Sequence, residues 1–200
     1  RNRQLELAIQ DYKKAAELIT SKEDSFEPDG IINSRHQYIG TYKSNIHYYL
    51  GQTSYALADY ETTVREMRLA AQQKLGYTDD RLVSTSYWLY LGLRKLGRHS
   101  DAEQVLDRVP TNLEMIENHT YYDSVLFFKG AKSEQVLLGD ADSLIRFSIG
   151  MDHYFKGNIE RAKALWLETV NRSAQGFWPA EAEILPVSYT HLTLPTTIEV

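Results

Sequence analysis

The sequence predicts an all-α fold built as a right-handed superhelical stack of antiparallel helical hairpins. One observation is that an apolar helix, a short break and a second amphipathic helix recur along the chain. Another is that a small residue, followed four positions later by a large one, recurs in the second helices. A third is that most of the 14 tyrosines lie in segments with helical periodicity rather than in the period-two alternation of strands.

Three segments of the chain have the helix–break–helix pattern. They span residues 45–70, 85–109 and 145–170, and their breaks fall at residues 58–59, 97–100 and 157–158. Glycine ends a helix at low cost because it tolerates a left-handed backbone conformation. The polar residues Asp59, Ser100 and Asn158 are expected to accept hydrogen bonds from the free N–H groups that begin the next helix. Each break therefore predicts a tight turn between two antiparallel helices.

The small and large residues of the second helices predict how each hairpin packs. The pairs are Thr63 and Met67, Ala102 and Leu106, Ala162 and Trp166, with Ala8 and Tyr12 as the second half of a hairpin near the N-terminus. A small side chain lets two helices approach, and a large one a turn later fills the space beside it. A large residue in place of Ala102 or Ala162 is therefore expected to overpack the contact between the helices.

Two of these features match a repeat pattern, W-x2-L-G-x2-Y followed by A-x3-F. The Leu-Gly positions are Leu50-Gly51 and Ile149-Gly150, and the Ala-x3-aromatic positions are Ala8–Tyr12, Ala102–Leu106 and Ala162–Trp166. Over most of residues 4–184 the chain therefore resembles a tetratricopeptide-repeat (TPR) protein, and it is similar to bacterial TPR proteins of unassigned activity. The resemblance implies a TPR-like α-solenoid and no particular reaction.

The chain also departs from the TPR pattern. His47, Tyr90 and Thr63 stand where tryptophan, glycine and alanine are usual. The small residues at positions 8, 63, 102 and 162 all lie further apart than the usual repeat of 34 residues. We therefore expect repeats with insertions rather than a regular array.

The insertions have their own patterns. Residues 20–45 contain a Pro-Asp-Gly turn signal and many polar residues, which predict a long loop. Further on, residues 112–130 are predicted to form a helix and residues 133–138 a short one, which together make an extra hairpin. Asp142 is expected to cap the helix that begins near Ser143.

Both ends of the chain are unusual. It begins without methionine and directly in helical periodicity, so we expect a fragment that starts within a repeat and lacks any N-terminal targeting region. Residues 186–200 are rich in threonine, are broken by proline and resemble translated sequencing-adaptor sequence. We therefore expect a helical-repeat domain over residues 1–185 and a non-native or disordered tail over residues 186–200.

Composition and motifs argue against several classes of function. The net charge of −5 does not favour nucleic acid, the absence of cysteine excludes thiolate sites, and no apolar run is long enough to span a bilayer. The chain has no glycine-rich phosphate loop and no catalytic G-x-S-x-G or H-E-x-x-H motif. No two of the six histidines are four residues apart on one predicted helix. We therefore expect no catalytic residue, no cofactor and no metal, and the cellular location stays open.

The remaining candidate site is a surface. In stacks of helical hairpins, one face of the first helices lines a concave groove, and tyrosine offers it contact area with a hydrogen-bonding tip. The predicted groove residues are Asn45, Tyr48, Gln52, Tyr55, Tyr87, Leu91, Arg94, Phe147, Met151 and Tyr154. They predict a non-catalytic scaffold module that binds a protein or peptide partner of unknown identity. Each tyrosine can equally pack between neighbouring repeats, and the Lys/Asn clamp of carboxylate-binding TPR grooves is not evident.

Two alternative functions remain open at this point. One is an enzyme, or an accessory domain of one, whose site is formed by the 20–45 loop over the groove. That reading requires Glu27 and Asp29 to meet His47 or His153 in one deep pocket. The other is a structural spacer or self-assembly module, which needs no groove.

Overall fold

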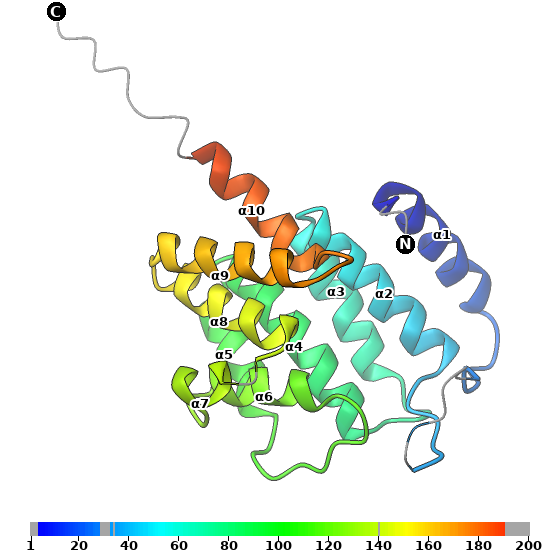
Figure 1. Ribbon diagram of the computed structural model, residues 1–200. Coiled ribbons are helices and arrows are strands. Elements are labelled where there is room, and N and C mark those ends of the chain that lie inside the picture. Colours follow the sequence, from blue (N-terminus) through cyan, green and yellow to red (C-terminus); the bar gives the residue numbers. More distant parts are fainter. Residues whose placement is uncertain (1–3, 29–32, 34, 140, 191–200) are drawn as a thin grey trace, which may run out of the picture. The chain divides into compact units, whose positions relative to one another are not determined.

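The computed structural model describes residues 4–28, 33, 35–139 and 141–190, with side chains as far as residue 184. The helices of this part are α1 (Leu5–Ile19), α2 (Tyr42–Ala56), α3 (Tyr60–Gln72), α4 (Asp79–Lys95), α5 (His99–Asp107), α6 (His119–Phe128), α7 (Glu134–Leu138), α8 (Ser143–Phe155), α9 (Ile159–Arg172) and α10 (Trp178–Thr190) (Figure 1). The described residues contain no strand, and their β pairing is limited to an isolated bridge between Phe26 and Thr41. The prediction of an all-α fold is confirmed.

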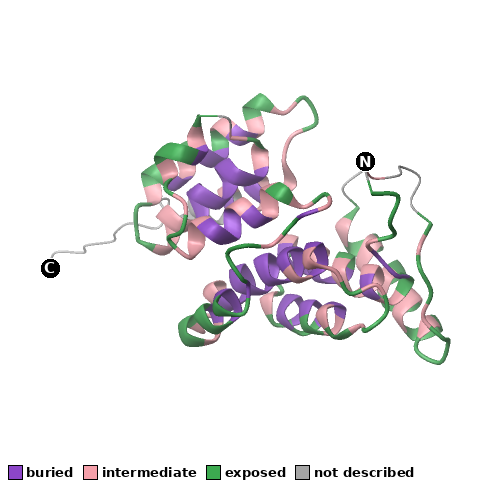
Figure 2. Cartoon of the chain, turned by 90° about the horizontal axis from the view of Figure 1, so that it is seen from below, coloured by how far each residue is buried: buried purple, intermediate pink, exposed green. Residues whose placement is uncertain are grey.

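The chain divides into two compact units, residues 1–136 and residues 137–200. In the first unit each of the helices α1 to α4 packs against the next one, and α4 also contacts α6 and α2. Helix α4 is the centre of this unit, since 13 of its residues are buried, among them Trp88 and Leu91. In the second unit α9 packs against both α8 and α10. Figure 2 marks the buried positions along the helices of each unit.

The small-and-large packing is confirmed in three of the four predicted places, whereas Ala8 and Tyr12 of α1 are only partly buried. Thr63, Ala102 and Ala162 are all completely buried. In the α2–α3 hairpin, a Cβ added to Gly51 would lie 2.8 Å from Cε of Met67, so the missing side chain is what admits the methionine. The same relation holds in the α8–α9 hairpin, where Gly150 faces the indole of Trp166. Close approach at a small residue, with a large one beside it, thus recurs in both units.

The turns between paired helices share one backbone arrangement. The left-handed position is Ala58 in the first hairpin (φ 59°), Gly97 in the second (72°) and Gly157 in the third (82°). After each one, a backbone N–H bonds back to a carbonyl five residues earlier, as in Asp59 to Ser54 at 2.9 Å. This is the Schellman arrangement, which satisfies the last carbonyls of a helix.

The capping residues of these turns were predicted only in part. The Asp59 carboxylate accepts from the Thr62 N–H at 3.1 Å, as expected. Asn158 makes no side-chain capping bond, and Ser100 lies inside α5, whose N-cap is Arg98. The Arg98 side chain accepts no bond from the first turn of α5. It forms an ion pair with Asp101 at 2.5 Å instead. The Asp142 cap is confirmed, since its carboxylate accepts from the Ile145 N–H at 2.9 Å.

The insertions required two corrections. The long loop ends at Thr41 rather than at residue 45, because Thr41 and Ser44 form a capping box that starts α2 at Tyr42. Residues 110–118 are not helical, and α6 begins only at His119. The short helix expected at 133–138 is present as α7. Helix α10 continues to Thr190, past the expected start of the tail, and residues 191–200 lie outside the described part.

Candidate functional site

The predicted groove residues fall into two groups. Five of them are core residues with at most 1% of their surface exposed: Tyr55, Tyr87, Leu91, Phe147 and Met151. The other five are partly exposed: Asn45, Tyr48, Gln52, Arg94 and Tyr154. The buried five pack against neighbouring helices, so the open part of the predicted face is smaller than expected. Whether the exposed residues contact a partner stays a prediction.

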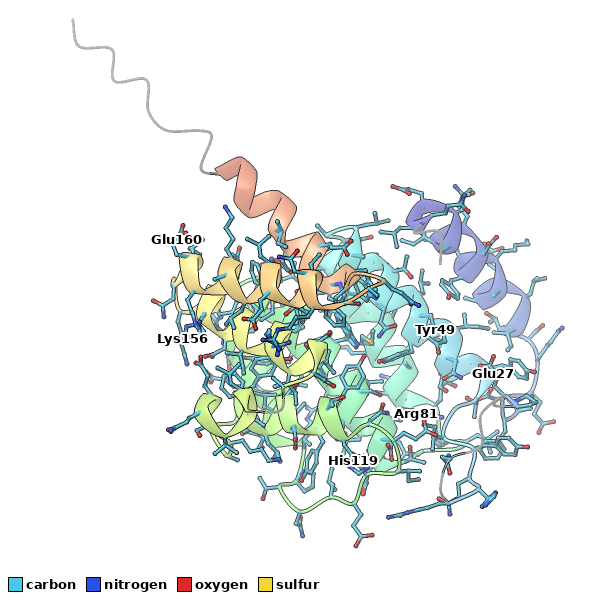
Figure 3. The ribbon with its side chains drawn as sticks, viewed as in Figure 1. Glu27, Tyr49, Arg81, His119, Lys156 and Glu160 are labelled. Carbon is cyan, nitrogen blue, oxygen red and sulfur yellow. The ribbon has the colours of Figure 1, made fainter. Side chains whose placement is uncertain are left out.

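Asn45 and Tyr48 lie together in a pocket of about 210 Å³ in the first unit. The pocket is lined by Ile39, Gly40, Ser44, Asn45, Tyr48, Tyr49, Ala70, Arg81, Ser84, Thr85, Glu117 and Asn118. Its walls therefore come from the first half of α2, the first half of α4, Ala70 of α3, and the loop residues before α2 and before α6. Figure 3 shows Tyr49 and Arg81, from two of these walls, with Glu27 of the 20–41 loop near them. It is the candidate functional site.

A half-buried polar cluster around the buried Trp88 fixes Tyr48 of the pocket wall. The Tyr48 hydroxyl lies 3.2 Å from the Tyr121 hydroxyl, and Gln52 Nε2 and Trp88 Nε1 each donate to both oxygens. Burial is the main reason why the pKa of Tyr48 is raised well above its usual value of 10.0, and the neighbouring Tyr121 raises this pKa further. The hydroxyl therefore stays protonated at neutral pH and acts as a hydrogen-bonding group. The sequence did not reveal Trp88 or Tyr121 as members, although a buried indole N–H generally requires an acceptor.

The loop before α2 folds onto the mouth of the pocket. Glu27 Oε2 accepts from Asn45 Nδ2 at 2.6 Å, and the Asp24 carboxylate accepts from the Lys43 N–H at 3.1 Å. Gly40 lies so close that a Cβ there would be 2.6 Å from Asn45 Nδ2. The loop is thus held to the start of α2 by side-chain as well as backbone contacts, and Glu27 is placed at the edge of the pocket.

Arg81 contributes a buried cation to the same region. Its Nη1 donates to the carbonyls of Gln73 and Leu75, at 3.1 and 2.9 Å. Burial lowers the pKa of Arg81, and the nearby Asp24 carboxylate offsets part of this shift. Arg81 Nη2 and Asp24 Oδ2 are both buried without a hydrogen-bond partner. The charge of Arg81 is therefore used within the protein, between two carbonyls and a nearby carboxylate.

Asp80 holds the far side of the pocket in place, which the sequence analysis missed. Its side chain is 1% exposed and accepts from the backbone N–H groups of Ile116, Glu117 and Asn118, at distances of 2.8 to 3.2 Å. These bonds satisfy the N–H groups outside a helix, and they explain why α6 does not begin earlier. The signal in the sequence was an acidic residue in the first turn of α4.

The residues of the enzyme reading do not gather in this pocket as far as the structure describes them. His47 Nδ1 lies 2.8 Å from the Glu66 carboxylate of α3, and the histidine does not line the pocket. Glu27 bonds to Asn45, whereas Asp29 is outside the described residues. His153 belongs to the second unit, where its Nδ1 is 3.4 Å from Asn158 Nδ2. Within the described part of the chain, no group of three His, Cys, Asp or Glu residues could hold a metal ion.

Two further results bear on the identity of the chain. Among the described residues, no helix combines the length and the apolar character that a membrane span requires. No family model matches the chain, and neither the curated proteins nor the solved structures contain a significant match.

Proposed function

We propose that this chain is a non-catalytic scaffold module of TPR-like α-solenoid type, which binds a protein or peptide partner at the α2–α4 pocket. The observation that carries the proposal is the pocket itself, with Asn45, Tyr48 and Tyr49 on its α2 wall. Recurring helical hairpins with Leu-Gly and small-and-large pairs support the TPR-like architecture.

The walls of the pocket favour binding by a preformed surface. Tyr48 is held by Gln52, Trp88 and Tyr121, and Asn118 is held by Asp80. Because these side chains are already ordered, a ligand loses little additional entropy when they are used for recognition. Tyr49 is 45% exposed and adds an aromatic surface at the rim. A peptide side chain entering the pocket would meet Tyr48, Tyr49 and Asn118.

The proposal is tested by selecting peptides on the intact chain from a random library and measuring their affinity for two variants. Tyr49→Ala removes a pocket wall that is already half exposed, so the fold should be retained. Leu57→Ala is the control, because Leu57 is 37% exposed at the other end of α2 and does not line the pocket. We expect Tyr49→Ala to weaken binding about tenfold and Leu57→Ala less than about twofold. Equal effects of the two variants, or no selected peptide at all, would sink the proposal.

Less supports the enzyme alternative. It relies on Glu27 at the edge of the pocket, but the histidine closest along α2, His47, is engaged with Glu66. His47, which this alternative requires beside Glu27, does not line the pocket, so the binding function is the better supported proposal.

A further inference from the structure

We propose that the α2–α4 pocket receives a basic side chain, lysine or arginine, of the bound peptide. This inference rests on the proposed function and names the chemistry that the pocket recognises. It follows from three properties of the lining: the hydrogen-bonding groups left over, the charge, and the aromatic wall.

Apart from Arg81, whose buried Nη2 has no hydrogen-bond acceptor, the polar side chains of the lining use their donors inside the protein and leave acceptors. Asn45 must turn its nitrogen toward Glu27, because a carboxylate only accepts, and its oxygen is left with a long 3.5 Å contact from Ser44. Asn118 likewise donates its nitrogen to the backbone carbonyl of Asp80, which leaves its amide oxygen. The pocket is therefore matched to a ligand that donates hydrogen bonds.

The hydroxyls of α4 follow the same rule. Thr85 Oγ1 donates to the carbonyl of Arg81 at 2.7 Å, and Ser84 Oγ donates to the same carbonyl at 3.4 Å. Their donors point back along the helix, so the lone pairs are what remains for a ligand. Four polar side chains, from α2, α4 and the loop before α6, thus offer oxygen acceptors.

The charge near the pocket also favours a cation. Glu117 lines the pocket and is exposed, and Glu27 lies at its edge through Asn45. The one basic group in the lining, Arg81, is 6% exposed; its Nη1 is bonded to two carbonyls, its Nη2 has no acceptor, and the nearby Asp24 carboxylate opposes its charge. The formal charge of the chain is −5, which attracts basic peptides at longer range.

Two tyrosines complete the recognition surface. Tyr48 and Tyr49 both line the pocket, and the centroids of their rings are 5.6 Å apart with an edge-to-face angle of 71°. Ammonium and guanidinium groups are attracted to aromatic faces within about 6 Å. A volume of about 210 Å³ suits a single long side chain rather than a helix. The methylene stem of lysine or arginine would contact the rings while its head reached the acceptors.

The test is a nuclear magnetic resonance titration of the intact chain with capped pentapeptides Gly-Gly-X-Gly-Gly, where X is lysine, arginine, norleucine or glutamate. This method detects binding as weak as about 1 mM, which is the range expected for one side chain. We expect the lysine and arginine peptides to shift the amide signals of Gly40 and Asn118 in a saturable way. Norleucine, which keeps the methylene chain but lacks the charge, should bind at least about tenfold more weakly.

Two variants separate the pocket's charge from general electrostatics. Glu117→Gln should weaken the lysine peptide at least about fivefold. Glu114→Gln is the matched control, since Glu114 lies on the same loop, is 84% exposed, pairs with Arg35 and does not line the pocket. The control should change affinity less than about twofold, because exposed charges are screened.

The possible failures are distinguishable. Equal binding of the norleucine and lysine peptides, or equal effects of the two glutamate variants, would overturn this inference. Selected peptides that need Tyr49 but contain no basic residue would also overturn it, while leaving the proposed function in place. Absence of binding by any peptide, selected or designed, would overturn both.

Discussion

The α2–α3 hairpin of the first unit and the α8–α9 hairpin of the second follow one packing pattern with different side chains. Gly51 faces the flexible thioether of Met67, whereas Gly150 faces the rigid indole of Trp166. The turn residue is Ala58 in one hairpin and a glycine in the other. The comparison shows that the backbone geometry is common to both hairpins, and that the tolerance to substitution should depend on which side chain fills the space.

The first helices of these hairpins also differ in exposure. On α8, Phe147 and Met151 are completely buried, whereas the α2 residues Asn45 and Tyr48 remain partly open beside a pocket. The first-helix face is thus open at Asn45 and Tyr48 in the first unit, whereas in the second unit only Tyr154 of the predicted α8 residues is partly exposed. This difference is the reason to place the proposed binding function in the first unit.

The largest effect on stability is expected at Gly150, one of the two glycines at which paired helices approach closely. In Gly150→Ala the new Cβ would lie 2.7 Å from Cδ1 of Trp166, and we expect a cost of about 2–3 kcal/mol because the indole has no room to move. In Gly51→Ala the neighbour is the flexible end of Met67, and the higher helix propensity of alanine offsets the strain, so the net change should stay within about 1 kcal/mol. Amide hydrogen exchange of each hairpin measures both; equal losses would contradict the comparison.

A related prediction concerns the small residue of α9. Ala162 is completely buried, so Ala162→Leu should overpack the α8–α9 contact at about 1–3 kcal/mol and lower the melting temperature. Ala164 lies on the same helix but is exposed, so Ala164→Leu should change stability by less than about 0.5 kcal/mol. Thermal unfolding of both variants would show whether Ala162 is a packing site; unchanged melting of Ala162→Leu would exclude it.

Packing of this kind was predictable from the sequence, because it depends on residue size at helical spacing. Thr63, Ala102 and Ala162 were identified in this way, and all three are buried. The start of α6 was not predictable, since it is set by Asp80, more than 30 residues earlier in the chain. Residues 112–118 have helical periodicity, but their N–H groups bond to a distant carboxylate rather than to a helix.

The ion pairs of the two hairpins provide a prediction of intermediate size. Glu66 is 5% exposed and bonds to His47 and Arg65, whereas Glu168 is 42% exposed and pairs with Arg146 and Arg172. Glu66→Gln should therefore cost about 1–2 kcal/mol at pH 7, since a charge-assisted bond is lost in a buried site. Glu168→Gln should cost less than Glu66→Gln, because Glu168 and Arg172 are both well exposed and the buried Arg146 keeps its bond to the Ala141 carbonyl at 2.9 Å.

The pH dependence gives the sign of the Glu66 contribution. Burial raises the pKa of Glu66, but the hydrogen bonds from His47 and Arg65 outweigh it, so the pKa is lowered from its usual 4.5. The stabilisation is therefore fully present above pH 4.5 and is lost as the pH falls through the lower pKa of the folded state. Urea unfolding should show the wild type and Glu66→Gln converging in stability in acid; a gap that widened there would refute this assignment.

The smallest effect is expected at the turns. Ala58 has φ 59°, a left-handed conformation that favours glycine, so Ala58→Gly should stabilise the α2–α3 hairpin by about 0.5–1 kcal/mol. The reverse change in the other hairpin, Gly157→Ala at φ 82°, should destabilise it by about 1 kcal/mol. A shift of the denaturation midpoint in the same direction for both variants would contradict the shared turn geometry.

The candidate site was predictable only in part. Asn45, Tyr48 and Gln52 were found from the face of one helix, and they do lie together at or next to the pocket. Tyr55 of α2, and Tyr87 and Leu91 of α4, were predicted from the same helical periodicity. Contacts from neighbouring helices nevertheless cover them completely or nearly so. Periodicity identifies which residues point the same way, and tertiary packing decides which of them a partner can reach.

The most direct test of the account is to map where selected peptides bind on the intact chain by nuclear magnetic resonance. The account predicts that the perturbed amides surround the pocket, at Gly40, Asn45, Ser84 and Asn118, and that α8 and α9 are unaffected. Perturbations centred on Phe147 and Met151 of α8, with the pocket residues unchanged, would contradict it.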